Sequence, residues 1–142
     1  MECKHFGQCG SCKIYEDGYD AQLEDKVVVT KKLFEQFINL EGDIFRSPDS
    51  GFRFRSEFKI FHDSDGIHYA MYDKNKKLFN IEECKIVNDD IQNIFEPLLE
   101  NIVSLDIGHK LFAVEFLSTT TKEMIITLIY HKILDENWEE KA

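Results

Sequence analysis

The chain begins Met1-Glu-Cys-Lys-His-Phe-Gly-Gln-Cys-Gly-Ser-Cys12, and this stretch organises the fold that we expect. Three of the four cysteines lie in it, and the fourth is remote; they are Cys3, Cys9, Cys12 and Cys84. Four thiolates, three on one short loop and one supplied by folding, suit a tetrahedral metal ion or a [4Fe–4S] cluster. Two glycines let the loop curl. We therefore expect a metal site that ties the N-terminus to the middle of the sequence.

The spacing leaves the identity of the metal open between iron and zinc. Structural zinc sites commonly use two C-x2-C pairs, and only Cys9 and Cys12 have that spacing. His5 lies inside the loop and could complete a site of three cysteines and one histidine. Because four cysteines are available, we expect His5 to be a bystander.

Length and composition indicate one globular domain in a reducing compartment. A chain of 142 residues with 43% apolar residues and twelve phenylalanines can bury a core of its own. It has no apolar run long enough to cross a membrane, and its charged start is unlike a signal peptide. We therefore expect a cytoplasmic protein, a monomer, whose cysteines are not paired in disulfides.

The charge distribution points to one basic region on an acidic chain. The net charge is −10, which argues against a general nucleic-acid coat. All three arginines nevertheless fall within ten residues, and a lysine follows; the four cations are Arg46, Arg53, Arg55 and Lys59. Such a patch suits phosphate groups. A solvated strand face is the alternative explanation.

The apolar periodicity predicts an α+β fold. We expect an antiparallel sheet of about five strands with helices on one face, in the order α-βββ-α-ββ, preceded by the Cys-rich metal-binding loop. Pro97 should kink or split the second helix. The predicted helices are 19–40 and 88–105, and the predicted strands are 52–61, 67–72, 77–84, 110–117 and 123–130.

The strand predicted at 52–61 has two distinct faces. One face should enter the core; it holds Phe52, Phe54, Ser56, Phe58 and Ile60. The other should carry cations about 7 Å apart, two strand residues along; it holds Arg53, Arg55, Glu57, Lys59 and Phe61.

Several short segments carry a family resemblance along the whole chain from Tyr19. They are Tyr19-Asp-Ala-Gln-Leu23, Lys26-Val27, Phe45-Arg-Ser-Pro48, Phe52-Arg-Phe-Arg-Ser-Glu-Phe58, His109-Lys-Leu-Phe112, Phe116-Leu-Ser-Thr-Thr120, Leu128-Ile-Tyr-His-Lys132, Leu134-Asp135 and Trp138. In this order they resemble the N-terminal part of the S-adenosylmethionine-dependent RNA (uracil-5-)-methyltransferases, most closely the tRNA branch. The resemblance implies a transferase that makes 5-methyluridine in the T-loop of tRNA.

The cysteine loop resembles a related branch, the rRNA (uracil-5-)-methyltransferases. That branch holds a [4Fe–4S] cluster on the pattern that Cys3, Cys9, Cys12 and Cys84 follow. The resemblance therefore implies a cluster, with zinc as the alternative, in a structural role. Two departures concern the substrate: many tRNA-branch members lack these cysteines, and the small β-barrel of many rRNA-branch enzymes is absent.

The resemblance also implies a second domain that these residues do not contain. Family members continue into a Rossmann-like domain with the S-adenosylmethionine loop, the nucleophilic cysteine and the glutamate that removes the C5 proton. No G-x-G-x-x-G sequence occurs here. We expect residues 1–18 to be the cluster loop, 19–133 the RNA-binding domain and 134–142 the start of a linker. Alone, the chain should be inactive.

The expected partner is the T-arm of tRNA, with rRNA as an alternative. The four cations are candidate phosphate contacts. Phe112 is either a core residue or a platform for an unpaired base, and His131 is a candidate contact beside Lys132. A free-standing iron–sulfur protein that binds RNA or transfers electrons is the other function that the sequence leaves open.

Overall fold

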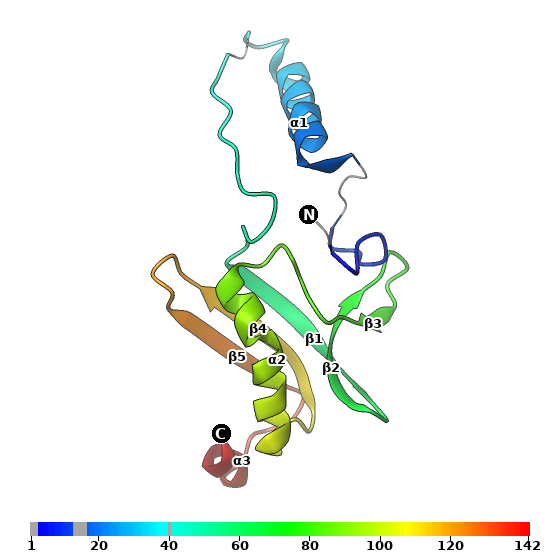
Figure 1. The fold of residues 1–142 in the computed structure, drawn as a ribbon, viewed down its shortest axis with the longest axis vertical. Coiled ribbons are helices and arrows are strands. Elements are labelled where there is room, and N and C mark those ends of the chain that lie inside the picture. Colours follow the sequence, from blue (N-terminus) through cyan, green and yellow to red (C-terminus); the bar gives the residue numbers. More distant parts are fainter. Residues whose placement is uncertain (1–2, 13–16, 40) are drawn as a thin grey trace.

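The computed structural model describes residues 3–12, 17–39 and 41–142 and confirms the α+β class (Figure 1). Five strands form one antiparallel sheet in the spatial order β3-β2-β1-β4-β5. The helices and strands follow the predicted order, with a short helix at the end. They are α1 (Gly18–Phe34), β1 (Arg55–Asp63), β2 (Gly66–Tyr72), β3 (Leu78–Asn80), α2 (Asp89–Ser104), β4 (Leu111–Ser118), β5 (Met124–Tyr130) and α3 (Glu136–Lys141).

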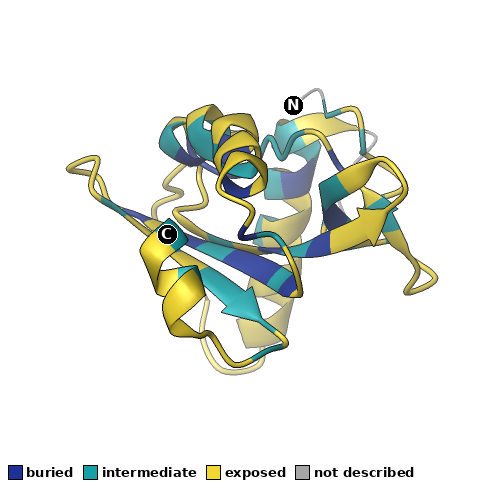
Figure 2. Cartoon of the chain, turned by 90° about the horizontal axis from the view of Figure 1, so that it is seen from below, coloured by how far each residue is buried: buried dark blue, intermediate teal, exposed yellow. Residues whose placement is uncertain are grey.

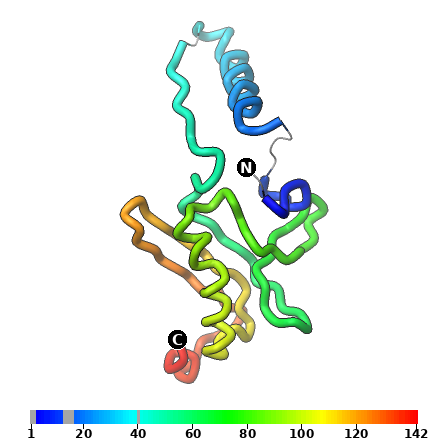
Figure 3. The backbone as a smooth tube through the Cα atoms, in the orientation of Figure 1, coloured from blue at the N-terminus to red at the C-terminus, as the bar shows by residue number. Residues whose placement is uncertain are grey.

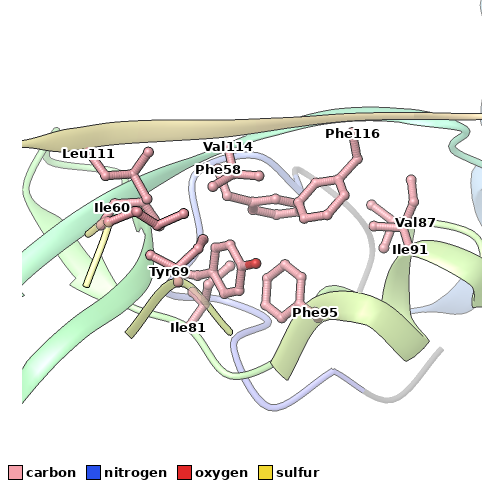
Figure 4. Close-up of a cluster of buried hydrophobic side chains, with 12 residues drawn as sticks. Phe58, Ile60, Tyr69, Ile81, Val87, Ile91, Phe95, Leu111, Val114 and Phe116 are labelled. Atoms are coloured by element: carbon pink, nitrogen blue, oxygen red, sulfur yellow. The ribbon is translucent and has the colours of Figure 1, made fainter. Parts of the chain in front are cut away.

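Helix α2 covers one face of the sheet, and the core lies between them (Figure 2). Four aromatic rings fill its centre: Phe58, Tyr69, Phe95 and Phe116, each at most 5% exposed. The rings of Tyr69 and Phe95 stack with centroids 3.8 Å apart, and Phe58 meets Phe95 edge-on at 4.9 Å (Figure 4). Such ring pairs add to the stability that burial itself provides. The opposite face of the sheet is left open by α2.

Helix α2 begins at a side-chain cap, as its sequence predicts. The Asn88 side chain accepts a hydrogen bond from the Ile91 N–H and donates one to the Ser118 hydroxyl. The prediction that Pro97 splits this helix is wrong, because α2 runs unbroken from Asp89 to Ser104. Ile91 and Ile102 are buried on either side of the proline, so packing on the sheet holds both halves in line.

The first strand begins later than its alternating pattern suggests. Phe52 and Phe54 are 42% and 37% exposed, so the prediction that they lie in the core is wrong. Before β1, Arg53 pairs instead with the chain that leads into α2: its N–H donates to the Ile86 carbonyl, and its carbonyl accepts from the Asn88 N–H. This pairing directs residues 52–54 away from the sheet.

Helix α1 departs from the predicted arrangement. It ends at Phe34 and not at residue 40, and in the described parts of the chain it packs against no strand and no other helix. Figure 1 shows it standing beyond the end of the sheet, and Figure 3 shows the chain returning from its far end as an extended segment. Helices on one face of the sheet is therefore correct for α2 and wrong for α1. None of the helices in the described ranges has the length and apolar character needed to cross a membrane.

Candidate nucleic-acid interface and cysteine site

Three predicted contact residues meet on the open face of the sheet. The rings of Phe112 and His131 stack with centroids 4.0 Å apart and planes inclined by 18°. The Nζ atom of Lys59 lies 4.2 Å from the centroid of the Phe112 ring. Lys59 belongs to β1, Phe112 to β4 and His131 directly follows β5. The fold thus assembles a cation, an aromatic ring and an imidazole from three strands, and we call this set the Lys59 stack.

An irregularity in β4 explains how Phe112 reaches this face. Val114 pairs with Phe58 and is buried with it, and Leu111 is buried as well. The pairing between β4 and β5 shifts register between Leu111 and Ala113, which leaves Phe112 as the extra residue. Such a bulge turns one side chain to the other face. Phe112 is half-buried and lies outside the core cluster.

Two acid–base pairs flank the Lys59 stack. Arg55 forms an ion pair with Glu115 on β4, and Lys59 forms one with Glu57 at 2.6 Å. Glu57 and Glu115 are directly paired in the sheet, so cations and carboxylates share the same face. Exposed pairs of this kind contribute little to stability. Their cations can therefore exchange a carboxylate for a phosphate at small cost.

The other two arginines lie elsewhere, so the prediction of one basic patch is wrong. Arg46 pairs with Asp20 at 2.7 Å and lies over the Tyr19 ring at the base of α1. Arg53 lines a cavity that also contains the cysteines. The expected row of three cations fails because β1 begins only at Arg55.

The four cysteines line one cavity of about 70 Å³ between the N-terminal loop and the sheet. All four are free thiols and half-buried; they are Cys3, Cys9, Cys12 and Cys84. In the residues that the structure describes, no three histidine, cysteine or acidic side chains form a group able to hold a metal ion. The donor set fits a four-thiolate centre in its chemistry, while the side chains converge on the cavity without surrounding a common point.

The N-terminal loop is held to the β2–β3 hairpin by contacts that involve no metal. The Gly10 N–H donates to the Tyr72 carbonyl at 2.9 Å, and a Cβ at Gly10 would lie 3.0 Å from that oxygen. Lys4 pairs with Glu82 at 2.8 Å. The Nε2 atom of His5 accepts the Glu82 N–H at 3.0 Å. His5 therefore fastens the loop. Sequence reasoning missed this role, because its partner is seventy-seven residues away.

Burial sets the protonation of the thiols. It raises the pKa of Cys84 to about 11, and burial together with the neighbouring Cys9 and Cys3 thiols raises the pKa of Cys12. Both groups are consequently protonated at neutral pH. A metal that binds thiolates here must displace these protons, so its affinity should increase with pH.

The open sheet face has the character of a surface that binds unpaired nucleotides, since such surfaces combine aromatic rings with cations. Residues 18–142 match the family model described as tRNA (Uracil-5-)-methyltransferase. The chain therefore belongs to the tRNA (uracil-5-)-methyltransferase family.

Individual relatives agree with this assignment. Over 145 residues the chain is 45% identical to a tRNA/tmRNA (uracil-C(5))-methyltransferase of Sulfurovum sp. (strain NBC37-1); the match covers 100% of the chain and 39% of that protein. A protein of the same description from Aliarcobacter butzleri (strain RM4018) is 39% identical, with 100% and 40% covered. The chain thus spans about two fifths of the length of these relatives.

Proposed function

We propose that this chain is the N-terminal RNA-recognition portion of an S-adenosylmethionine-dependent tRNA (uracil-5-)-methyltransferase that makes 5-methyluridine in the T-loop. Family membership and the share of the relatives' length that it spans support this proposal. In this account residues 1–18 are the cysteine loop, 19–133 the RNA-binding domain and 134–142 the start of the link to the methyltransferase domain. The full-length protein acts in the cytoplasm.

The observation that carries the proposal is the Lys59 stack. An unpaired base can stack on the exposed edge of the Phe112–His131 pair, as bases do on aromatic platforms of single-strand readers. The charge of Lys59 then lies beside the phosphate backbone, and Arg55 provides a guanidinium that can bind phosphate oxygens in pairs. Arg53 and Arg46 contact more distant phosphates in this account.

The chemistry belongs to the part of the relatives that lies outside this chain. S-adenosylmethionine supplies the methyl group there, and the sequence here has no glycine-rich loop that fits it. The role of this chain is to hold the T-arm so that the target uridine, turned out of its stack, can enter a separate active site. The 142 residues alone should bind RNA without methylating it.

We further propose that Cys3, Cys9, Cys12 and Cys84 hold a [4Fe–4S] cluster, with a zinc ion as the alternative occupant. The convergence of the four free thiols on one cavity supports this assignment. So does the resemblance of their spacing to the rRNA branch. The role of the cluster is structural, because it would join the N-terminal loop to the connection between β3 and α2.

The same resemblance makes 23S rRNA the second candidate substrate. Binding of a T-arm stem–loop in competition with an rRNA hairpin distinguishes the two. We expect the T-arm to compete more strongly, because the family match covers the RNA-binding domain. Preference for the rRNA hairpin would replace tRNA by rRNA in this proposal.

The ion pairs give a direct test of RNA binding by the open face. Replacing Glu115 by glutamine frees Arg55 and removes a negative charge beside the bound backbone, so we expect the T-arm to bind about two- to fivefold more tightly. The measurement is the dissociation constant as a function of salt, which should show a steeper salt dependence in the variant.

Glu100→Gln is the matched control. Glu100 is exposed on α2, the helix that covers the opposite face, and the change removes the same charge. Equal tightening in both variants would mean that only net charge matters. It would contradict binding at the open face.

A further inference from the structure

Helix α1 and the segment that follows it expose an unusual amount of apolar surface. We call residues 18–39 and 41–48 the α1 arm. Phe37 is 72% exposed and Phe45 88% exposed, which is far more than an isolated domain needs to leave in water. Six further apolar side chains of the arm are 45–64% exposed: Val28, Val29, Leu33, Phe34, Ile38 and Ile44.

The apolar residues of α1 do not form a single stripe. Val27, Val28 and Val29 are consecutive, and consecutive helical residues point about 100° apart. The one fully buried residue in the helix is the polar Gln22. A helix that is apolar on several sides is usually enclosed by protein. The helix therefore has the composition of a buried element although it stands alone.

The base of the arm is nevertheless fixed. The Tyr19 hydroxyl accepts a hydrogen bond from the Ser47 N–H at 2.9 Å, and Arg46 pairs with Asp20. These contacts join the start of α1 to the end of the returning segment. The far end, with Leu33, Phe34 and Phe37, is held by no element of the described chain. The arm is thus anchored to the domain at one end and open at the other.

We propose that the α1 arm is the docking surface for the methyltransferase domain of the full-length protein, an inference that rests on the proposed function. The relatives contain about three fifths of their length outside the matched region, and the family match includes α1. A domain linked in the same chain meets the arm at high effective concentration. Docking on an arm anchored at Tyr19 would fix the distance between the bound T-arm and the active site.

The experiment measures hydrogen exchange of α1 in the full-length protein and in residues 1–142. We expect exchange at the far end of α1 to be at least tenfold slower in the full-length protein. The double substitution Leu33→Asp and Phe37→Asp should abolish that protection and make the arm sensitive to protease. Val103→Asp is the control, because Val103 is 61% exposed on α2 and lies outside the arm.

The outcomes separate this proposal from the proposed function. Fast exchange of α1 in a full-length protein that binds the T-arm overturns docking and leaves RNA recognition intact. Protection already present in residues 1–142, increasing with concentration together with a dimer mass, makes a second copy the occupant and also overturns it. Failure of every form to bind the T-arm would contradict the proposed function instead.

Discussion

Replacing Cys84 by serine is expected to remove nearly all iron from the protein. Anaerobically purified wild-type protein should be brown and contain about four iron atoms per chain. Serine supplies a hydroxyl in place of the one cysteine that lies outside the N-terminal loop. The variant should therefore be colourless and should unfold at lower temperature, because the loop is no longer joined to the β3–α2 connection through metal. Iron analysis and visible absorption measure the first effect.

His5→Ala is the informative companion to this variant. It removes the hydrogen bond from the Glu82 N–H but keeps all four thiols. We expect the iron content to stay near that of the wild type. Loss of iron from His5→Ala alone would make the histidine a ligand. Colourless wild-type protein with one zinc ion per chain would contradict the cluster and leave the zinc alternative.

Replacing Phe112 by alanine is expected to weaken T-arm binding by about tenfold or more. Stacking of a base on an aromatic side chain contributes about 1–3 kcal/mol, and the change also removes the surface on which His131 and Lys59 rest. Stability should change less than in a core variant, because Phe112 lies outside the buried cluster. Titration with a labelled T-arm stem–loop gives the affinity, and urea unfolding gives the stability.

Phe112→Tyr supplies the matched comparison. It keeps the aromatic ring and should retain affinity within about threefold, since stacking depends on the ring. If alanine and tyrosine bind the T-arm equally well, the stack is not a base platform. If both unfold, Lys59→Ala tests the same site from β1 without altering the bulge.

Local sequence pattern was sufficient for most of the fold. Alternation and turn residues place β2, β4 and β5 within a residue or so of their observed ends, and the apolar stripe with its Asn88 cap predicts α2. The start of β1 could not be predicted in this way. The alternation continues back to Phe52, but Arg53 pairs with the chain at Val87, which is a long-range choice.

The candidate site was predictable in its parts and not in its assembly. The spacing of the cysteines indicates that they converge, and they do line one cavity. The Lys59 stack could not be derived from alternation, because a bulge breaks the period of two at Phe112. The basic residues looked like one patch, yet tertiary structure sends Arg46 to the α1 arm and Arg53 to the cysteines.

Photo-crosslinking to a thiouridine-substituted T-arm tests most directly whether the open face of the sheet binds RNA. The account predicts crosslinked peptides from the start of β4 and the end of β5, which carry Phe112 and His131. It also predicts that Phe112→Ala reduces this crosslinking and leaves the folded state intact. Crosslinks confined to α2, which covers the other face, would contradict the account.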